Sequence, residues 1–155
     1  PWGRGGSPIQ NQIVRGVYDS EVCAVEARPE LDAGPVYMRR SIDLSKGTVE
    51  EILLQVSLIT FDMIMMIVTG EARPKEQEGE VVLFKRRKRS ESRLPLEAFS
   101  GRGVYDFVRM LDGEGYPAAF LEYGNQKVEL SDARLHPDGA VTGTFRLQVM
   151  KEHDK

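Results

Sequence analysis

The chain has 155 residues, of which 41% are hydrophobic and 29% are charged. These values are typical of soluble globular domains and exclude disordered, collagen-like and coiled-coil proteins. With 21 basic and 24 acidic residues the net charge is −3, so the chain as a whole does not attract DNA or an anionic membrane. A single cysteine, Cys23, and two distant histidines predict no disulfide and no metal site, and they favour a reducing, cytoplasmic compartment.

The first residues predict a loop and then a short helix. Residues 3–6 (GRGG) are expected to form only a loop. Ser7 is predicted to cap the helix N-terminus in a capping box, and Gly16 to end the helix in a left-handed conformation. The helix is therefore expected over residues 8–15. Because the sequence opens on Pro1 in the middle of this loop, we expect the chain to be a fragment of a longer protein.

Two short strands follow, over residues 21–26 and 36–40, with a glycine- and proline-bounded turn between them. Asp32 lies in this turn, where a carboxylate can be held in one pose and aimed at a site as a general base or a water-orienting group. Alternatively, Asp32 only caps its own turn. The residues alone leave both interpretations open.

The longest predicted helix begins at Thr48. Apolar residues recur every three or four positions as far as Ile67, and residues 63–68 are apolar all round. A segment of this length raises the question of a membrane span. Asp62 near its middle makes a helix packed against a protein core the better interpretation, and we expect no membrane contact.

The second half of the chain predicts a separate small unit. Residues 80–84 are a strand, and residues 85–93 carry six basic side chains, which indicate a linker that is either solvated or in contact with phosphates. A helix at 102–111 and strands at 118–123, 127–130 and 141–149, joined by glycine turns, complete the predicted order.

Arg4 and the glycines around it lie directly before the predicted first helix. The free N–H groups of a helix start, together with a guanidinium, suit an anion or a developing oxyanion. The alternative is a plain connecting loop. The segment matches neither a Walker A motif nor a dinucleotide fingerprint.

Four segments together carry a family resemblance: residues 1–10 (PWGRGGSPIQ), 31–36 (LDAGPV), 104–112 (VYDFVRMLD) and 115–120 (GYPAAF). In this order and spacing they resemble the second half of the 10-formyltetrahydrofolate-dependent formyltransferases. That family includes methionyl-tRNA formyltransferase and the sugar N-formyltransferases.

The resemblance implies an α/β fold. Residues 1–84 would be the C-terminal half of a Rossmann-like catalytic domain, residues 85–95 a basic linker, and residues 96–155 a small, β-rich, OB-like C-terminal domain.

The resemblance also implies the chemistry. The family uses an Asn, a His and an Asp; Asp32 matches the Asp, whereas the Asn and the His lie upstream of the part that this sequence matches. The formyl donor is 10-formyltetrahydrofolate, for which Glu30, Leu31 and Asp32 are the expected contacts. Arg4 and Gly5 are expected to border the substrate.

Several functions remain open at this point. We expect an amino-sugar nucleotide as the acceptor, because the 105–120 block resembles the sugar branch. The alternative acceptor is methionyl-tRNA, bound through residues 85–89. A third hypothesis is a non-catalytic module whose sheet edge is covered by a partner or, in a homodimer, by a second copy. A fourth is an RNA-binding protein with an OB-like barrel.

Overall fold

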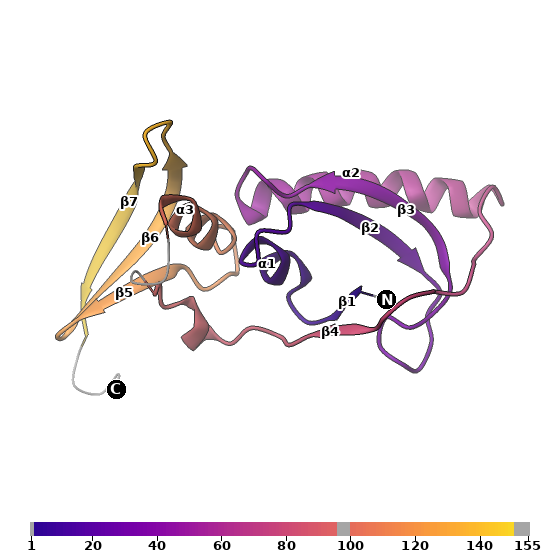
Figure 1. Cartoon of the computed structure of the whole chain (residues 1–155), viewed down its shortest axis with the longest axis horizontal. Helices are drawn as coiled ribbons and strands as arrows, with labels where there is room; N and C mark the ends of the chain where they lie inside the picture. Colours follow the sequence, from indigo (N-terminus) through magenta and orange to yellow (C-terminus); the bar gives the residue numbers. More distant parts are fainter. Residues whose placement is uncertain (1, 96–99, 151–155) are drawn as a thin grey trace. The chain divides into compact units, whose positions relative to one another are not determined.

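The computed structural model describes residues 2–95 and 100–150 of a mixed α/β protein (Figure 1). The chain divides into two compact units, one formed by residues 1–47 and 51–87 and the other by residues 48–50 and 88–155. The expected start of the C-terminal domain at residue 96 falls on 96–99, outside the described residues.

The opening segment is a strand, so the prediction that residues 3–6 form only a loop is wrong. Strand β1 (Trp2–Gly5) pairs in parallel with β4 (Val82–Phe84). Gly3 and Gly5 have φ values of +79° and +105°, which the strand tolerates because glycine has no Cβ. A Cβ on Gly5 would lie 2.5 Å from the carbonyl oxygen of Phe84, so the partner strand approaches too closely for any side chain there.

Helix α1 (Pro8–Ile13) is shorter than expected, and the predicted cap at its start is wrong. Ser7 has a φ of +49°, and its side chain makes no cap bond to the helix. Its hydroxyl instead accepts a hydrogen bond from the backbone N–H of Arg87, at 3.1 Å. Gly16 adopts the predicted left-handed backbone, with a φ of +69°.

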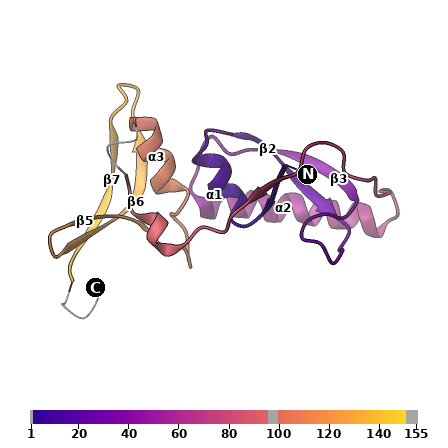
Figure 2. The same ribbon diagram turned by 60° about the horizontal axis from the view of Figure 1, so that its bottom comes forward.

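The two strands predicted at 21–26 and 36–40 are present as β2 (Asp19–Val25) and β3 (Val36–Asp43), and they pair antiparallel in a register that sets Cys23 opposite Arg39. Helix α2 (Val49–Val68) follows β3 and runs alongside this hairpin in both ribbon views (Figures 1 and 2). The helix therefore forms a second layer against the hairpin.

The prediction that α2 packs against a core holds for one of its faces. Ile52 is fully buried and Met63 is 2% exposed. The opposite face is exposed, although it too is apolar. By length and composition α2 is also the one helix among the described residues that could cross a membrane.

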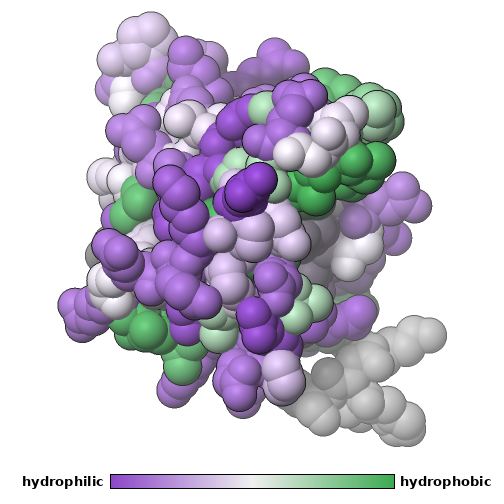
Figure 3. All heavy atoms as spheres, turned by 90° about the vertical axis from the view of Figure 1, so that its right-hand side faces the viewer, coloured by the Kyte–Doolittle hydropathy of each residue, from purple (hydrophilic) through white to green (hydrophobic). Residues whose placement is uncertain are grey.

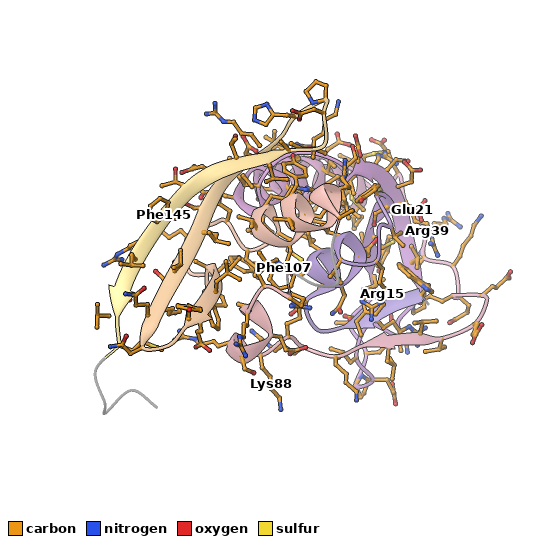
Figure 4. The ribbon with its side chains drawn as sticks, turned by 60° about the vertical axis from the view of Figure 1, so that its left-hand side comes forward. Arg15, Glu21, Arg39, Lys88, Phe107 and Phe145 are labelled. Carbon is orange, nitrogen blue, oxygen red and sulfur yellow. The ribbon has the colours of Figure 1, made fainter. Side chains whose placement is uncertain are left out.

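The basic segment is attached to the N-terminal unit through its backbone. The side-chain amide of Asn11 donates hydrogen bonds to the carbonyl oxygens of Gly6 and Lys85, each at 3.0 Å. The short helix η1 (Arg89–Ser92) follows. The side chains of Lys85, Arg86, Lys88 and Arg89 are exposed, and Lys88 extends away from the ribbon in Figure 4.

The C-terminal unit combines α3 (Gly101–Arg109) with an antiparallel sheet in the order β5 (Ala119–Tyr123), β6 (Gln126–Leu135), β7 (Val141–Val149). Strand β6 continues beyond its predicted end at residue 130 because a bulge between Ser131 and Arg134 absorbs polar residues that break the alternation. The described residues form an open sheet, so an OB-like barrel stays a prediction.

Candidate active site

Asp32 lies in the turn between β2 and β3, and its backbone is in the left-handed region, with a φ of +53°. This conformation is uncommon outside glycine, and Asp and Asn adopt it more readily than most other residues. Close by, a Cβ on Gly34 would lie 1.9 Å from the carbonyl oxygen of Glu26, so the turn closes tightly against the end of β2. The turn therefore holds Asp32 in a defined pose.

One carboxylate oxygen of Asp32 is fixed from β1. The backbone N–H of Gly5 donates to Asp32 Oδ2 at 2.9 Å, which joins two segments that are far apart in sequence. Within residues 2–95 and 100–150, no partner is recorded for Oδ1 of this exposed side chain. An Asp held by one oxygen can use the other to orient an imidazole or a water molecule.

Gln77 connects strand β1 with the turn that holds Asp32, and nothing in the sequence singled this residue out. Its amide nitrogen donates to the carbonyl oxygens of Asp32 and Gly34, at 2.8 and 2.7 Å. Its amide oxygen accepts from Nε and Nη2 of Arg4, at 3.2 and 2.8 Å. Gln77 lies in a polar stretch without helical or strand period, so no local signal could have identified it.

A cavity of about 520 Å³ lies beside these residues, and its volume is in the usual range for small-ligand sites. Of the predicted site residues, Arg4 and Asp32 line it, whereas the side chains of Glu30 and Leu31 are exposed and are not among its lining residues. The structure thus brings Arg4, Gly5 and Asp32 together. Besides Arg4, Asp32 and Gln77, the lining includes Trp2, Val25 and Val36, which are apolar, and Glu21, Cys23 and Arg39.

The hairpin contributes an ion pair and a thiol to the cavity. Arg39 Nη1 lies 3.0 Å from Glu21 Oε2, and Figure 4 shows the two side chains together on β3 and β2. This hydrogen bond holds the pKa of Arg39 above its ordinary value. Cys23 is exposed, but partial desolvation of its sulfur raises the pKa of the thiol, and the charge of the neighbouring Arg39 partly opposes that shift.

We expect Cys23 to react with iodoacetamide at pH 8 more slowly than a cysteine of ordinary pKa does. A raised pKa leaves less thiolate at that pH, and the thiolate is the reacting form. Replacing Arg39 by Gln removes the charge that lowers this pKa, so alkylation should slow further. The control is Arg28→Gln, because Arg28 pairs with Glu26, and it should leave the alkylation rate of Cys23 unchanged. Mass spectrometry is unambiguous here because the chain has one cysteine. Faster alkylation in Arg39→Gln would contradict the inference that the charge of Arg39 lowers the pKa of Cys23.

No group of three or more His, Cys, Asp or Glu side chains suited to a metal ion occurs among the residues that the structure describes. The site combines the Asp32 carboxylate held by Gly5, the Glu21–Arg39 ion pair and Arg4 with a cavity that has apolar and polar walls. Such a set can bind an organic ligand and move a proton.

Comparison with known proteins identifies related chains. A family model described as the C-terminal domain of methionyl-tRNA formyltransferase matches residues 89–148. The curated methionyl-tRNA formyltransferase of Sulfurihydrogenibium sp. is 26% identical over 138 residues, which cover 85% of this chain and 43% of that protein. The chain spans about half the length of the curated relatives it matches.

Solved structures extend this likeness. Methionyl-tRNA formyltransferase from Clostridium thermocellum superposes with a TM-score of 0.90 at 40% identity, covering 96% of this chain and 65% of that one. At 20% and 19% identity, two others share the fold. HypX from Aquifex aeolicus in complex with tetrahydrofolic acid has a TM-score of 0.63, and the match covers 86% of this chain and 24% of that one. A likely sugar N-formyltransferase from Mycobacterium tuberculosis has a TM-score of 0.60, and the match covers 98% of this chain and 62% of that one. The chain therefore belongs to the formyltransferase family that includes the methionyl-tRNA and sugar N-formyltransferases.

Proposed function

We propose that this chain is the C-terminal part of an enzyme that transfers a formyl group from 10-formyltetrahydrofolate to the amino group of methionyl-tRNA. The observation that carries the proposal is the 40% identity, over 96% of this chain, with a structure named methionyl-tRNA formyltransferase. The curated relatives carry the same name. These relatives favour methionyl-tRNA over the amino-sugar nucleotide that the sequence analysis expected.

Asp32 is the residue to which we assign the proton transfer. When an amine nitrogen bonds to the formyl carbon, the bond from that carbon to the donor nitrogen breaks, the amine loses a proton and the donor nitrogen gains one. Gly5 fixes Asp32 Oδ2, so Oδ1 is the atom that would orient the imidazole or water that accepts this proton. Arg4, held by Gln77 at the cavity wall, would stabilise negative charge that develops on the formyl oxygen.

The cavity beside Asp32 is our candidate for part of the folate pocket. Its volume of about 520 Å³ and its mixture of apolar and charged walls suit a flat, partly polar ligand. Of residues 30–32 only Asp32 lines the cavity, and we propose that Glu30 and Leu31, which precede it, contact the donor through the main chain. The presence of tetrahydrofolic acid in a HypX structure of the same fold supports this choice of ligand.

We further propose that the N-terminal unit is half of a Rossmann-like sheet. The support is the parallel pairing of β1 with β4, because parallel strands occur almost only in larger sheets whose faces are covered by helices.

The exposed basic segment at residues 85–89 is our candidate for the tRNA contact. Its backbone is fixed by Asn11 and Ser7, while Lys85, Arg86, Lys88 and Arg89 extend their side chains into solvent. Cationic side chains of this kind bind phosphate oxygens. In a chain with a net charge of −3, this local cluster supplies the attraction that the whole surface lacks.

Neutralising two of these residues should weaken tRNA binding. In the double variant Arg86→Gln/Arg89→Gln we expect affinity to fall about tenfold at moderate salt, and the slope of log K against log salt to become shallower by roughly one unit or more. Filter binding over a salt series measures both. Lys46→Gln removes an exposed charge of the N-terminal unit outside this segment, and this variant should bind almost as the unmodified chain does. Equal losses of tRNA affinity in both variants would show that the segment at residues 85–89 does not contact the tRNA.

The acceptor is tested by a formyl-transfer assay with 10-formyltetrahydrofolate. Methionyl-tRNA and a panel of nucleotide-linked amino sugars are the acceptors. The enzyme samples are this chain and the chain extended by whatever its gene encodes before Pro1. We expect turnover with methionyl-tRNA in the longer sample. Turnover with amino sugars alone would overturn the acceptor, and no turnover in any sample would favour a non-catalytic binding module.

A further inference from the structure

Residues 69–79 follow α2, and this segment has no large apolar side chain with which to pack against the core. Figure 3 looks at the end of the N-terminal unit where the segment runs, and hydrophilic residues cover most of that face. A segment that buries little apolar surface gains little from the hydrophobic effect. Its position therefore depends on the hydrogen bonds that it makes.

Two residues of this segment bond to the turn that carries Asp32. The backbone of Lys75 exchanges two hydrogen bonds with the backbone of Val36, at 2.7 and 2.9 Å. Gln77 adds its side chain, whose amide nitrogen donates to the carbonyl oxygens of Asp32 and Gly34 at 2.8 and 2.7 Å. The turn is thus held both at the start of β3 and through two of its own carbonyl groups.

The amide of Gln77 spends its whole hydrogen-bonding capacity on the protein. A primary amide has two N–H donors and two acceptor positions on its oxygen. Both donors go to the turn, and the oxygen accepts from Nε and Nη2 of Arg4, at 3.2 and 2.8 Å. Gln77 lines the cavity, but its amide has no donor or acceptor left for a ligand. Any influence of this amide on a bound ligand must pass through Arg4 and Asp32, which also line the cavity.

This set of contacts requires a glutamine. Among side chains of similar length, Glu offers only acceptors when it is ionised, whereas Lys and Arg offer only donors. We propose that Gln77 is a positioning residue for formyl transfer, whose single amide fixes the turn that presents Asp32 and, on its other side, the guanidinium of Arg4. The catalytic part of this inference rests on the proposed function. The groups assigned to the proton and to the oxyanion then share one support.

Two substitutions separate the two contacts. Gln77→Glu keeps an acceptor for Arg4 but sets carboxylate oxygens against the carbonyl oxygens of Asp32 and Gly34, so the turn should be released. Gln77→Lys can still donate to these carbonyls, but it offers Arg4 no acceptor and repels its charge. Gln55→Glu makes the same chemical change as the first variant at an exposed position of α2, and it is the matched control.

Hydrogen exchange of the Gly5 amide reports the pose of Asp32 and requires no turnover. This N–H donates to Asp32 Oδ2, so it should exchange faster when the carboxylate moves away. By NMR on this chain we expect roughly tenfold faster exchange in Gln77→Glu and a nearly unchanged rate in Gln77→Lys and in Gln55→Glu. Asp32→Gly removes the acceptor and tolerates the φ of +53°, so it gives the rate of an unprotected Gly5 amide.

The kinetic test uses the chain extended by whatever its gene encodes before Pro1. Both Gln77 variants should lower kcat about tenfold to a hundredfold with little change in KM, because the Gln77 amide binds no ligand. A double-mutant cycle separates the two paths. In the Asp32→Asn background, Gln77→Glu should cost little further kcat, whereas Gln77→Lys should keep its full effect. A purely structural role would lower activity in both backgrounds alike.

Three results would overturn the proposal. The Gly5 amide could exchange at the unmodified rate in Gln77→Glu, or equally fast in Gln77→Glu and Gln77→Lys. The kcat of Gln77→Glu could also match that of the unmodified enzyme although Asp32→Asn has lost its activity. Absence of turnover in every sample would count against the proposed function instead, and the Gly5 exchange rates would still decide whether Gln77 holds the carboxylate.

Discussion

Replacing Asp32 by Asn should reduce formyl transfer by about a hundredfold to ten-thousandfold while leaving the fold intact, if the assignment of Asp32 is right. The Asn oxygen can still accept the hydrogen bond from the Gly5 N–H, and Asn tolerates the left-handed backbone at this position. The variant therefore removes the negative charge and the basicity while preserving the geometry. The loss should fall on kcat, with a small change in KM, because the group acts on the proton and not on substrate binding.

The measurement is steady-state kinetics on the polypeptide that includes the preceding segment. Glu78→Gln provides the control, because Glu78 is an exposed carboxylate of the same unit that does not line the cavity. That control should retain most of the activity. Turnover of Asp32→Asn close to that of the unmodified enzyme would remove Asp32 from the proton transfer.

The sequence was sufficient to predict the elements whose contacts are made between residues close together in the chain. The period of α2 is set by its own residues, and the Gly124-Asn125 turn between β5 and β6 fixes that hairpin, with a φ of +61° at Gly124. Asp32 could be singled out because a carboxylate in a glycine-bounded turn is a local pattern. For these features the sequence neighbours that decide the structure are only a few residues apart.

The remaining features depend on partners far away in the chain. Residues 3–6 read as a loop because nothing in them indicates β4, about eighty residues later, as the partner strand. Ser7 was predicted as a helix cap because the competing donor, the N–H of Arg87, could not be seen from the sequence. Gln77 holds both Asp32 and Arg4 and yet lies in a stretch without pattern. The sequence therefore indicated residues that lie together in the structure, namely Arg4, Gly5 and Asp32, but it did not indicate the contacts that hold them in place.

Replacing Asp106 by Asn should destabilise the C-terminal unit by about 3–5 kcal/mol. Asp106 Oδ1 accepts from Arg109 Nε at 2.7 Å and lies 2.7 Å from Nη2, and the Arg109 side chain is 1% exposed. Neutralising the carboxylate leaves this guanidinium charge buried beside a weak acceptor, and desolvation of the charge is then poorly compensated. Tyr105, whose ring lies 5.1 Å from the Arg109 guanidinium carbon, offsets only part of this cost.

Hydrogen exchange of the amides in α3 and β6 measures the effect within the unit concerned, because the rate of the slowest amides reports the free energy of opening. Arg102→Ala is the control. Arg102 pairs with the same carboxylate at 2.8 Å, but its side chain is 38% exposed, so water replaces much of what is lost and the expected cost is about 1 kcal/mol or less. The double variant Asp106→Asn/Arg109→Met should recover part of the loss, since it removes the buried positive charge that the Asp106 carboxylate balanced. A double variant no more stable than Asp106→Asn would show that the buried guanidinium is not the source of the cost.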